Sequence, residues 1–133
     1  MKVILNIFCW VLVIFCIWFP FSYFKSGADK KEIKVSHILV NSFDEADKLK
    51  KEIENKEIKF EDAASKYSLC PSKEDKGDIG YNMRGMLIKD FENAAYKLEP
   101  YKISDPVKTQ EGWHLIKVTD VKYFSDGEFN KRY

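Results

Sequence analysis

The sequence predicts an α+β domain with a small, mostly antiparallel sheet, preceded by one apolar N-terminal helix. Three observations lead to this prediction. Short strands are expected at both ends of the charged part of the chain, three amphipathic helices lie between them, and the first 24 residues carry almost no charge. With 133 residues, of which 45% are hydrophobic and 32% charged, the chain has room for one folded domain and little else.

Residues 3–24 form an apolar stretch without a charged residue. As a helix this stretch would reach about 33 Å, enough for the roughly 30 Å hydrocarbon core of a membrane. Trp18 and Tyr23 would then lie near one membrane interface, where amphipathic rings are favoured. The stretch predicts a single-pass transmembrane anchor.

A cleaved signal peptide and a buried core helix are the alternatives for this stretch. The apolar region of a signal peptide is usually about 7–15 residues long, but a small-x-small site at residues 26–28 would permit cleavage. Lysines flank both ends, so the positive-inside rule does not fix the orientation. Because only two residues precede the stretch and a domain follows it, we expect the domain on the exported side, periplasmic or extracellular.

The domain is expected to begin after a short linker. Residues 25–33 are small and charged, which is typical of a linker. Residues 34–40 then predict a strand that places Val35, His37 and Leu39 on one face.

Three helices are predicted downstream of this strand. The first is capped by Ser42 or Asp44 and runs to about residue 55, the second begins near residue 60, and the third covers residues 88–98. The side chains expected to pack inward recur at helical spacing: Ala46, Leu49 and Ile53 in the first, Phe60, Ala64 and Tyr67 in the second, and Phe91, Ala95 and Leu98 in the third.

The remaining segments predict loops and strands. Residues 68–80 carry turn chemistry throughout and are expected to form a long ordered loop. Short strands are predicted at residues 81–84, 103–108 and 113–121. The last strand places His114, Ile116 and Val118 on one face. Residues 122–133 have no strong pattern and are expected to form a C-terminal tail.

Charge and cysteine content exclude several classes of protein. Apart from Lys2, every charged residue lies beyond residue 24, where acidic and basic residues balance. A nucleic-acid-binding domain normally presents a basic surface, so no nucleic-acid partner is expected. Cys9 and Cys16 fall in the apolar stretch, which leaves Cys70 without a partner for an intradomain disulfide and the chain without a CxxC zinc motif.

The two histidines, His37 and His114, each lie in the middle of a predicted strand among aliphatic residues. If these strands are neighbours, the imidazoles can approach each other and Cys70. Alternatively, both are buried structural histidines that bind backbone groups or hydroxyls such as those of Ser36 and Thr109. A zinc site of both histidines and the cysteine would lack a fourth ligand. A thiol hydrolase would need a nucleophile signature that is missing around the cysteine.

Four segments occur in a characteristic order: VSHILV, then FEDAASKYSLCPSKEDKGDIGY, then MRG followed by DFENAAYKL, and finally ISDPVKTQEGWHLIKV. Together they resemble the parvulin family of peptidyl-prolyl cis-trans isomerases from about residue 35 to residue 118, without a large insertion. The resemblance implies that residues 34–121 form a four-stranded antiparallel sheet surrounded by about four helices.

The resemblance also implies a catalytic site. His37 and His114 match the paired histidines at the centre of the family's active site. Cys70 matches a position that is cysteine or aspartate in different members, and Thr109 matches a hydroxyl that hydrogen-bonds toward the pair.

A proline-binding pocket is implied as well. Ile79, Leu87 and Phe91 match the positions that form it, with Leu87 where methionine is usual. Met86 precedes it in place of a common glutamine and is counted with the substrate-binding residues. Glu111 occupies a position near the site that is often a small or amide residue, so it can alter substrate preference.

The resemblance implies an isomerase that acts on X-Pro bonds in unphosphorylated, exported protein clients and needs no cofactor. The apolar stretch would tether this isomerase to the membrane. Phosphate-directed parvulins carry an arginine-bearing insertion after the first histidine, whereas this chain has only NSFDEAD. The alternative is a non-catalytic peptide-binding chaperone module of the same fold.

Overall fold

The computed structural model describes residues 30–132. The predicted anchor at residues 3–24 and most of the predicted linker lie outside this range. Among the described residues, no helix has both the length and the apolar character that crossing a membrane requires.

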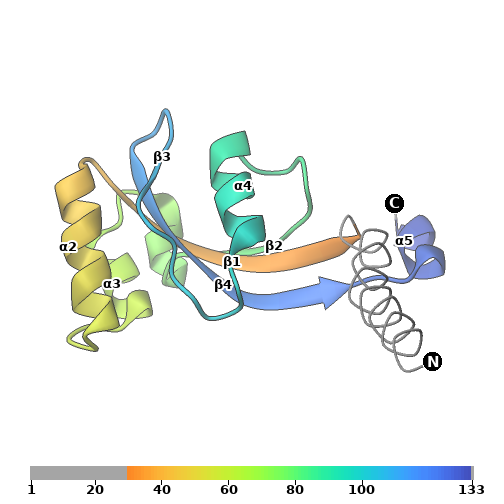
Figure 1. The fold of residues 1–133 in the computed structure, drawn as a ribbon, viewed down its shortest axis with the longest axis horizontal. Helices are drawn as coiled ribbons and strands as arrows, with labels where there is room; N and C mark the ends of the chain where they lie inside the picture. Colours follow the sequence, from red (N-terminus) through yellow and green to blue (C-terminus); the bar gives the residue numbers. More distant parts are fainter. Residues whose placement is uncertain (1–29, 133) are drawn as a thin grey trace, which may run out of the picture. The chain divides into compact units, whose positions relative to one another are not determined.

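Four antiparallel strands form one sheet in the order β2-β1-β4-β3 (Figure 1). The strands are β1 (Lys31–Val40), β2 (Asp78–Asn82), β3 (Val107–Lys108) and β4 (Trp113–Tyr123). The helices are α2 (Phe43–Glu54), α3 (Phe60–Tyr67), the 3-10 helix η1 (Pro71–Asp75), α4 (Lys89–Lys97) and α5 (Asp126–Arg132). The predicted α+β class and the four-stranded antiparallel sheet are confirmed.

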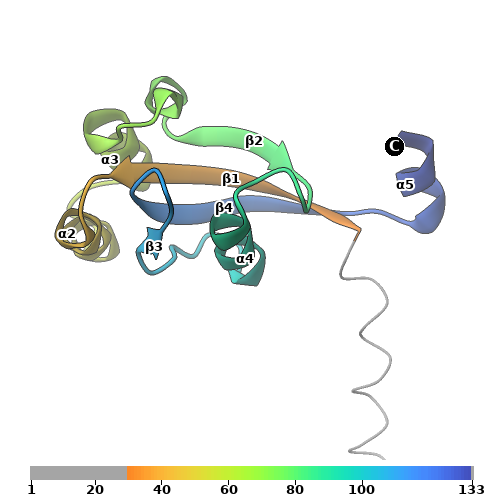
Figure 2. The same cartoon turned by 90° about the horizontal axis from the view of Figure 1, so that it is seen from above.

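The central strand β1 is covered on both faces. Successive side chains of a strand point to opposite faces, and two separate clusters of buried side chains result. Ile38 and Val40 pack with Leu115 against α2 and α3, whereas Val35 packs with Ile116 against α4. Figures 1 and 2 show α2 and α3 together at the carboxyl end of β1, with α4 farther along the strands. His37 has the parity of the face that α4 covers.

Helix α2 begins where the sequence predicts. Of the two candidate caps, Ser42 is the one used: its hydroxyl accepts a hydrogen bond from the Glu45 backbone N–H at 3.2 Å. Ala46 and Leu49 are buried and Ile53 packs partly buried beside them, as predicted.

Helix α3 differs from the prediction at its last residue. Phe60 and Ala64 face the core as expected and Ala63 joins them, but Tyr67 is 40% exposed. The buried stripe follows the i, i+3, i+4 spacing of a single face. Tyr67 lies one turn later, where the chain leaves the helix through an extended Ser68, so its ring is not drawn into the core.

The predicted loop at residues 68–80 contains η1 and the start of β2, so the strand prediction of 81–84 was about three residues late. Asp78 and Gly80 are residue types that favour turns, so the sequence pattern did not indicate a strand at these positions. Pairing with β1 outweighs these local preferences: Asp78 is opposite Ser36 in the sheet, and its carboxylate forms a 2.9 Å ion pair with Lys34.

Other element boundaries also moved. β1 begins at Lys31 and takes the last three residues of the predicted linker. β3 covers two residues instead of 103–108, because Pro106 has no N–H to donate; Ile103 makes only an isolated bridge to Lys117. The predicted tail contains the end of β4 and α5. Three α-helices pack against the sheet in place of about four, because the segment after α3 forms only a short 3-10 helix.

Candidate active site

The sheet brings the two histidines together across its central strand pair. In the β1–β4 register, Leu39 is opposite His114 and His37 is opposite Ile116. The imidazoles meet with their Nδ1 atoms 3.1 Å apart and their planes only 12° from parallel. Both side chains are buried, with 6% of His37 and 1% of His114 exposed. The two imidazoles therefore lie close together, as expected for histidines on neighbouring strands.

The pair is the middle of a longer chain of hydrogen bonds. At one end, Thr109 Oγ1 lies 2.8 Å from His114 Nε2 and accepts a hydrogen bond from the Glu111 N–H. At the other end, Ser72 Oγ lies 3.1 Å from His37 Nε2. Four polar side chains thus form one continuous line through the buried site.

Two arrangements of protons give every ring N–H in this line an acceptor. The Glu111 N–H donates to Thr109 Oγ1, which keeps a second lone pair and its own proton, so the threonine hydroxyl can donate to His114 Nε2 or accept from it. When it donates, His114 carries its proton on Nδ1 and donates to His37, whose Nε2 proton points to Ser72; when it accepts, every bond of the line is reversed. In both arrangements the tautomers of the two histidines are coupled.

Both imidazoles are uncharged at neutral pH. Burial, reinforced by the neighbouring His114, lowers the pKa of His37 from 6.5 to about 4. Burial also lowers the pKa of His114, although the Glu111 carboxylate acts in the opposite direction. Uncharged rings fit an arrangement with one proton in each hydrogen bond, since two doubly protonated rings would place two N–H groups against one another at the 3.1 Å contact.

Phe91 on α4 closes the apolar side of the pair. Its ring stands nearly perpendicular to both imidazoles, with centroids 5.4 Å from His37 and 5.3 Å from His114. Ile79 and Leu87 pack partly buried against the same cluster. Aromatic and aliphatic surface therefore lies directly beside the polar line, as the resemblance implied. Met86, in contrast, is 65% exposed.

Cys70 is not a member of the hydrogen-bonded line. It lies between α3 and η1, partly buried, and its backbone N–H donates to Ser68 Oγ at 3.3 Å. Among the described residues, no hydrogen bond links its thiol to either imidazole, and no three His, Cys, Asp or Glu side chains are grouped to hold a metal ion. The alternative zinc site is therefore not formed among these residues, and the approach of the thiol to the imidazoles stays a prediction.

The hydroxyl that does reach His37 belongs to Ser72, which the sequence analysis did not single out. Gly77 makes this contact possible. It has a φ of 84° and donates its N–H to the Ser72 carbonyl at 2.8 Å, while its own carbonyl accepts from the His37 N–H at 2.9 Å. A Cβ at this position would lie 2.5 Å from the His37 carbonyl oxygen. The loop can lie this close to β1 only because residue 77 is glycine.

Glu92 is a second residue that the sequence analysis missed. Its carboxylate is buried in α4, with only 8% of the residue exposed, and accepts the Gly85 N–H at 2.5 Å. Arg84 approaches the same carboxylate at 3.9 Å and stacks over the ring of Tyr96. Glu92 therefore holds the turn that leads into Leu87. Arg84 faces this carboxylate, which leaves it less available to a substrate.

Replacing Ser72 with alanine is expected to lower any activity of this site about fivefold, because one hydrogen bond contributes about 1 kcal/mol. The loss should come with a change in the His37 tautomer, since Nε2 loses its hydrogen-bond partner. Ring ¹⁵N chemical shifts would report the tautomer directly. Ser65→Ala is the matched control, because its hydroxyl binds only the Lys73 carbonyl on the surface. Unchanged His37 shifts in the Ser72 variant would contradict the arrangement.

Comparison with known proteins gives a consistent match over the domain. The profile of the PPIC-type PPIase domain, a rotamase, matches residues 30–120. Foldase protein PrsA 1 of Bacillus cereus is 50% identical over 94 residues, which are 70% of this chain and 32% of the relative. The chain thus spans about a third of the length of the curated relatives it matches.

Solved structures agree with the sequence match. The crystal structure of the peptidylprolyl isomerase PrsA from Bacillus anthracis superposes with a TM-score of 0.72 at 42% identity, covering 78% of this chain and 49% of that one. The solution structure of NmPin, the parvulin of Nitrosopumilus maritimus, has a TM-score of 0.63 at 36% identity, covering 68% of this chain and 98% of that one.

Proposed function

The chain belongs to the PPIC-type peptidyl-prolyl isomerase family, and on this premise we propose that it accelerates the cis-trans isomerisation of X-Pro bonds in polypeptide clients. The observation that carries the proposal is the buried, uncharged pair of His37 and His114 with the Phe91 ring against both imidazoles. This places a polar line and an apolar wall side by side, as a prolyl amide requires.

Isomerisation of an X-Pro bond needs no bond to be made or broken. Rotation about the amide interrupts its resonance, with a barrier of about 18–20 kcal/mol. An enzyme lowers this barrier by binding the twisted amide better than either planar form. A thousandfold acceleration needs about 4 kcal/mol of such preference, since each factor of ten corresponds to about 1.36 kcal/mol.

The apolar residues would hold the proline ring. Phe91, Leu87 and Ile79 exclude water from one side of the bond, which favours an amide whose charge separation is reduced by twisting. Leu87 in place of methionine conserves volume, and such exchanges are usually mild. Met86, on the exposed turn before the pocket, would contact the client chain beyond the ring.

The polar line would act on the other side of the bond. The hydrogen bonds at both ends of the line hold the two imidazoles in place and couple their tautomers, so the surface that His37 and Ser72 present to the client is preorganised. Cys70 lies at the start of η1 in the same loop. Its role in this proposal is to shape the polar rim, without attacking the substrate.

The client class follows from the same surface. Only Asn41 and Ser42 separate β1 from α2, which leaves no room for an arginine-bearing phosphate site between them. We therefore propose unphosphorylated X-Pro sequences as substrates. The uncharged residues 3–24 support tethering through a single membrane span. The proposal places the domain on the exported side.

The proposal is tested by two-dimensional NMR exchange on an unphosphorylated Ala-Pro peptide. The full chain, held in lipid nanodiscs, should produce exchange cross-peaks between cis and trans signals at catalytic amounts. A His37→Ala/His114→Ala variant should lose them, with a loss of at least a hundredfold. Cys70→Ala is the control variant and should retain activity within about threefold, because removing an unbonded thiol costs less than one hydrogen bond.

Two results would contradict the proposal. Peptide shifts without exchange would identify a binding module that does not catalyse, which is the alternative function. Exchange that persists in a folded double variant would place the activity elsewhere. If the double variant fails to fold, Thr109→Val serves instead and should lower activity about tenfold, since it removes the hydroxyl that is hydrogen-bonded to His114 Nε2.

A further inference from the structure

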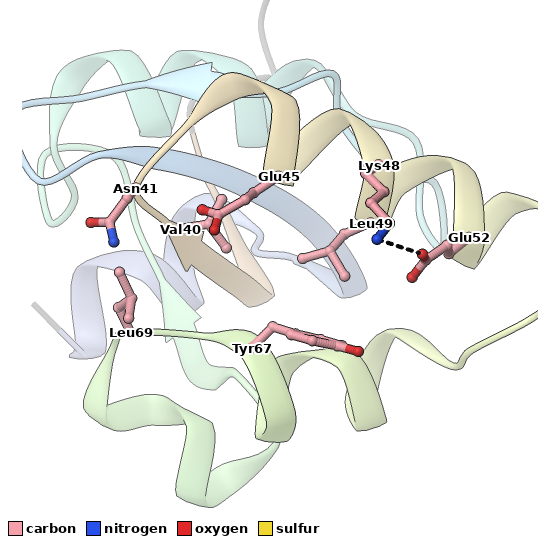
Figure 3. Close-up of a pocket in the computed structure, with 8 residues that line it drawn as sticks. All are labelled: Val40, Asn41, Glu45, Lys48, Leu49, Glu52, Tyr67 and Leu69. Atoms are coloured by element: carbon pink, nitrogen blue, oxygen red, sulfur yellow. Dashed lines mark ion pairs between the residues drawn. The ribbon is translucent and has the colours of Figure 1, made fainter.

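A cavity lies between α2, α3 and the segment that follows α3, away from the candidate active site beside α4. It encloses about 230 Å³. Figure 3 shows Leu49 of α2 and Tyr67 of α3 on opposite sides of it, with Leu69 beside Tyr67 and Val40 at the end of β1. We call this cavity the α2–α3 groove. Its volume suits one large side chain and is too small for most cofactors.

The apolar lining of the groove is open to solvent. Tyr67 is 40% exposed and Leu69 is 55% exposed. Neighbouring exposed apolar side chains often mark an interaction site. Tyr67 is also the residue that helical spacing assigned to the core, so the chain presents an aromatic ring at the groove in place of burying it.

The groove wall is held in place by β1. The Leu69 N–H donates to the Leu39 carbonyl at 2.8 Å, and the Ser68 hydroxyl accepts the Leu39 N–H at 3.1 Å. The same hydroxyl accepts the Cys70 N–H. Because this segment is already held in one conformation, the protein would lose little conformational entropy when a ligand binds to the groove.

The charged rim leaves one negative group uncompensated. Lys48 lies 3.8 Å from Glu52 along α2, visible as the dashed contact in Figure 3. Glu45 also lines the groove, and among the described residues its carboxylate has no ion pair. An occupant with an apolar side chain beside a cation would therefore complement both the lining and the rim.

The groove is close to the candidate active site along the chain. Leu69 is three residues before Ser72, the residue that contacts His37. Ser68 and Cys70 are both extended and η1 begins at Pro71, so these three steps span at most about 10 Å. A client held at the histidines could reach the groove with a residue three to five positions from its proline.

We propose that the α2–α3 groove is an accessory client site, which binds a leucine-sized or larger apolar side chain followed by a lysine or arginine, three to five residues from the proline. The inference rests on the proposed isomerase function, and it adds a sequence preference outside the X-Pro bond. It predicts that such an anchor lowers KM without raising kcat, because the groove does not touch the amide that twists.

The test compares three peptides of equal length with a central Ala-Pro. One carries Leu-Lys four residues before the proline, one carries it four residues after, and one carries Ser-Gly at both places. Nanodiscs hold the full chain, which avoids free detergent that would compete for an apolar groove. At least one Leu-Lys peptide should show a KM about tenfold lower than the Ser-Gly peptide, equivalent to about 1.4 kcal/mol. Equal KM values for all three peptides would overturn the inference.

Matched variants assign the effect to the groove. Leu69→Ser should reduce the tenfold KM ratio to about one, whereas Tyr123→Ser, which changes a 70% exposed ring on β4, should leave the ratio at ten. Glu45→Gln should reduce the ratio about threefold. Asp44→Asn removes a carboxylate from the same first turn of α2 outside the groove lining and should not change it. Equal effects of Glu45→Gln and Asp44→Asn would contradict the proposed role of the rim.

A direct binding measurement separates this inference from the proposed function. A proline-free Leu-Lys peptide should shift the amide signals of Leu49, Tyr67 and Leu69, whether or not the chain catalyses isomerisation. Isomerisation of the Ser-Gly peptide without these shifts would overturn the groove alone. Shifts without isomerisation of any peptide would overturn the proposed function alone.

Discussion

Replacing Phe91 with alanine is expected to lower the free energy of unfolding by about 3–5 kcal/mol and to abolish the proposed isomerase activity. The ring is 4% exposed and stands against both imidazoles. Its removal would leave a cavity at the centre of the α4 face and free both histidines to rotate. Stability and the site would be lost together because one side chain supports both.

Chemical denaturation and peptide exchange measure these two effects. Phe43→Ala is the matched control within the chain, because that ring is 46% exposed and packs only edge-on against Trp113. It should cost about 1 kcal/mol and leave the site intact. If both phenylalanine variants lost the same free energy of unfolding, the ring of Phe91 would not be the main support of the sheet face that α4 covers. Full activity in a folded Phe91→Ala variant would remove it from the proposed pocket.

Acidification from pH 6.5 to pH 4 is expected to remove about 3 kcal/mol of stability through His37. The folded chain holds the pKa of this imidazole at about 4, against 6.5 for an exposed histidine. Between these values the unfolded chain binds a proton that the folded chain does not. The stabilisation is therefore complete above pH 6.5 and is lost as the pH falls toward 4. His114, whose pKa is also lowered, adds to the effect in the same direction.

Denaturant titrations at half-unit pH steps would measure this slope. A His37→Gln/His114→Gln variant should show a much flatter profile in the same window, since glutamine does not titrate. Carboxylates with lowered pKa values, such as Glu61 and Asp120, also destabilise the fold in acid. Their ordinary values of 4.5 and 3.8 place most of that effect below the histidine window. A wild-type profile that stays flat between pH 6.5 and 4 would mean that the imidazoles are not buried as a neutral pair.

The parts of the fold that follow from local periodicity could be predicted from the sequence. Ala46, Leu49 and Ile53 recur at helical spacing, and Ser42 precedes them as a cap, so α2 was located closely. The two-residue period of residues 34–40 placed His37 with Val35 on one face, where α4 now covers them. The family resemblance then identified a parvulin-like sheet, which the strand order and the matched structures confirm.

Boundaries that depend on distant partners could not be predicted in this way. Asp78 is a turn residue by type, and only its ion pair with Lys34 and its place opposite Ser36 make it part of β2. Tyr67 has the spacing of a buried residue in a helix. Its burial depends on whether the sheet extends beneath it, and only the assembled domain decides that.

The site was predictable only where it lies on strands. His37 and His114 meet because β1 and β4 are neighbours, which the strand assignments and the resemblance both suggested. The contacts of Ser72 and Glu92 form because loops fold back onto β1 and α4. These loops depend on Gly77 beside β1 and on Gly85 beside α4. No local pattern marks such contacts. The catalytic and binding roles of these residues remain predictions for the experiments above.

The pairing of β1 with β4 also has a consequence for the order in which the chain is made. The two imidazoles are separated by 77 positions in sequence, and β4 supplies both the second one and the strand between β1 and β3. Contacts of such long sequence separation form late and slowly. While the polypeptide is being synthesised, β1 has only β2 to pair with, and its α4 face lacks Ile116 and Val118. A product that stops before Trp113 therefore lacks the partner strand and the second imidazole, and is expected to be a substrate for folding helpers and proteases.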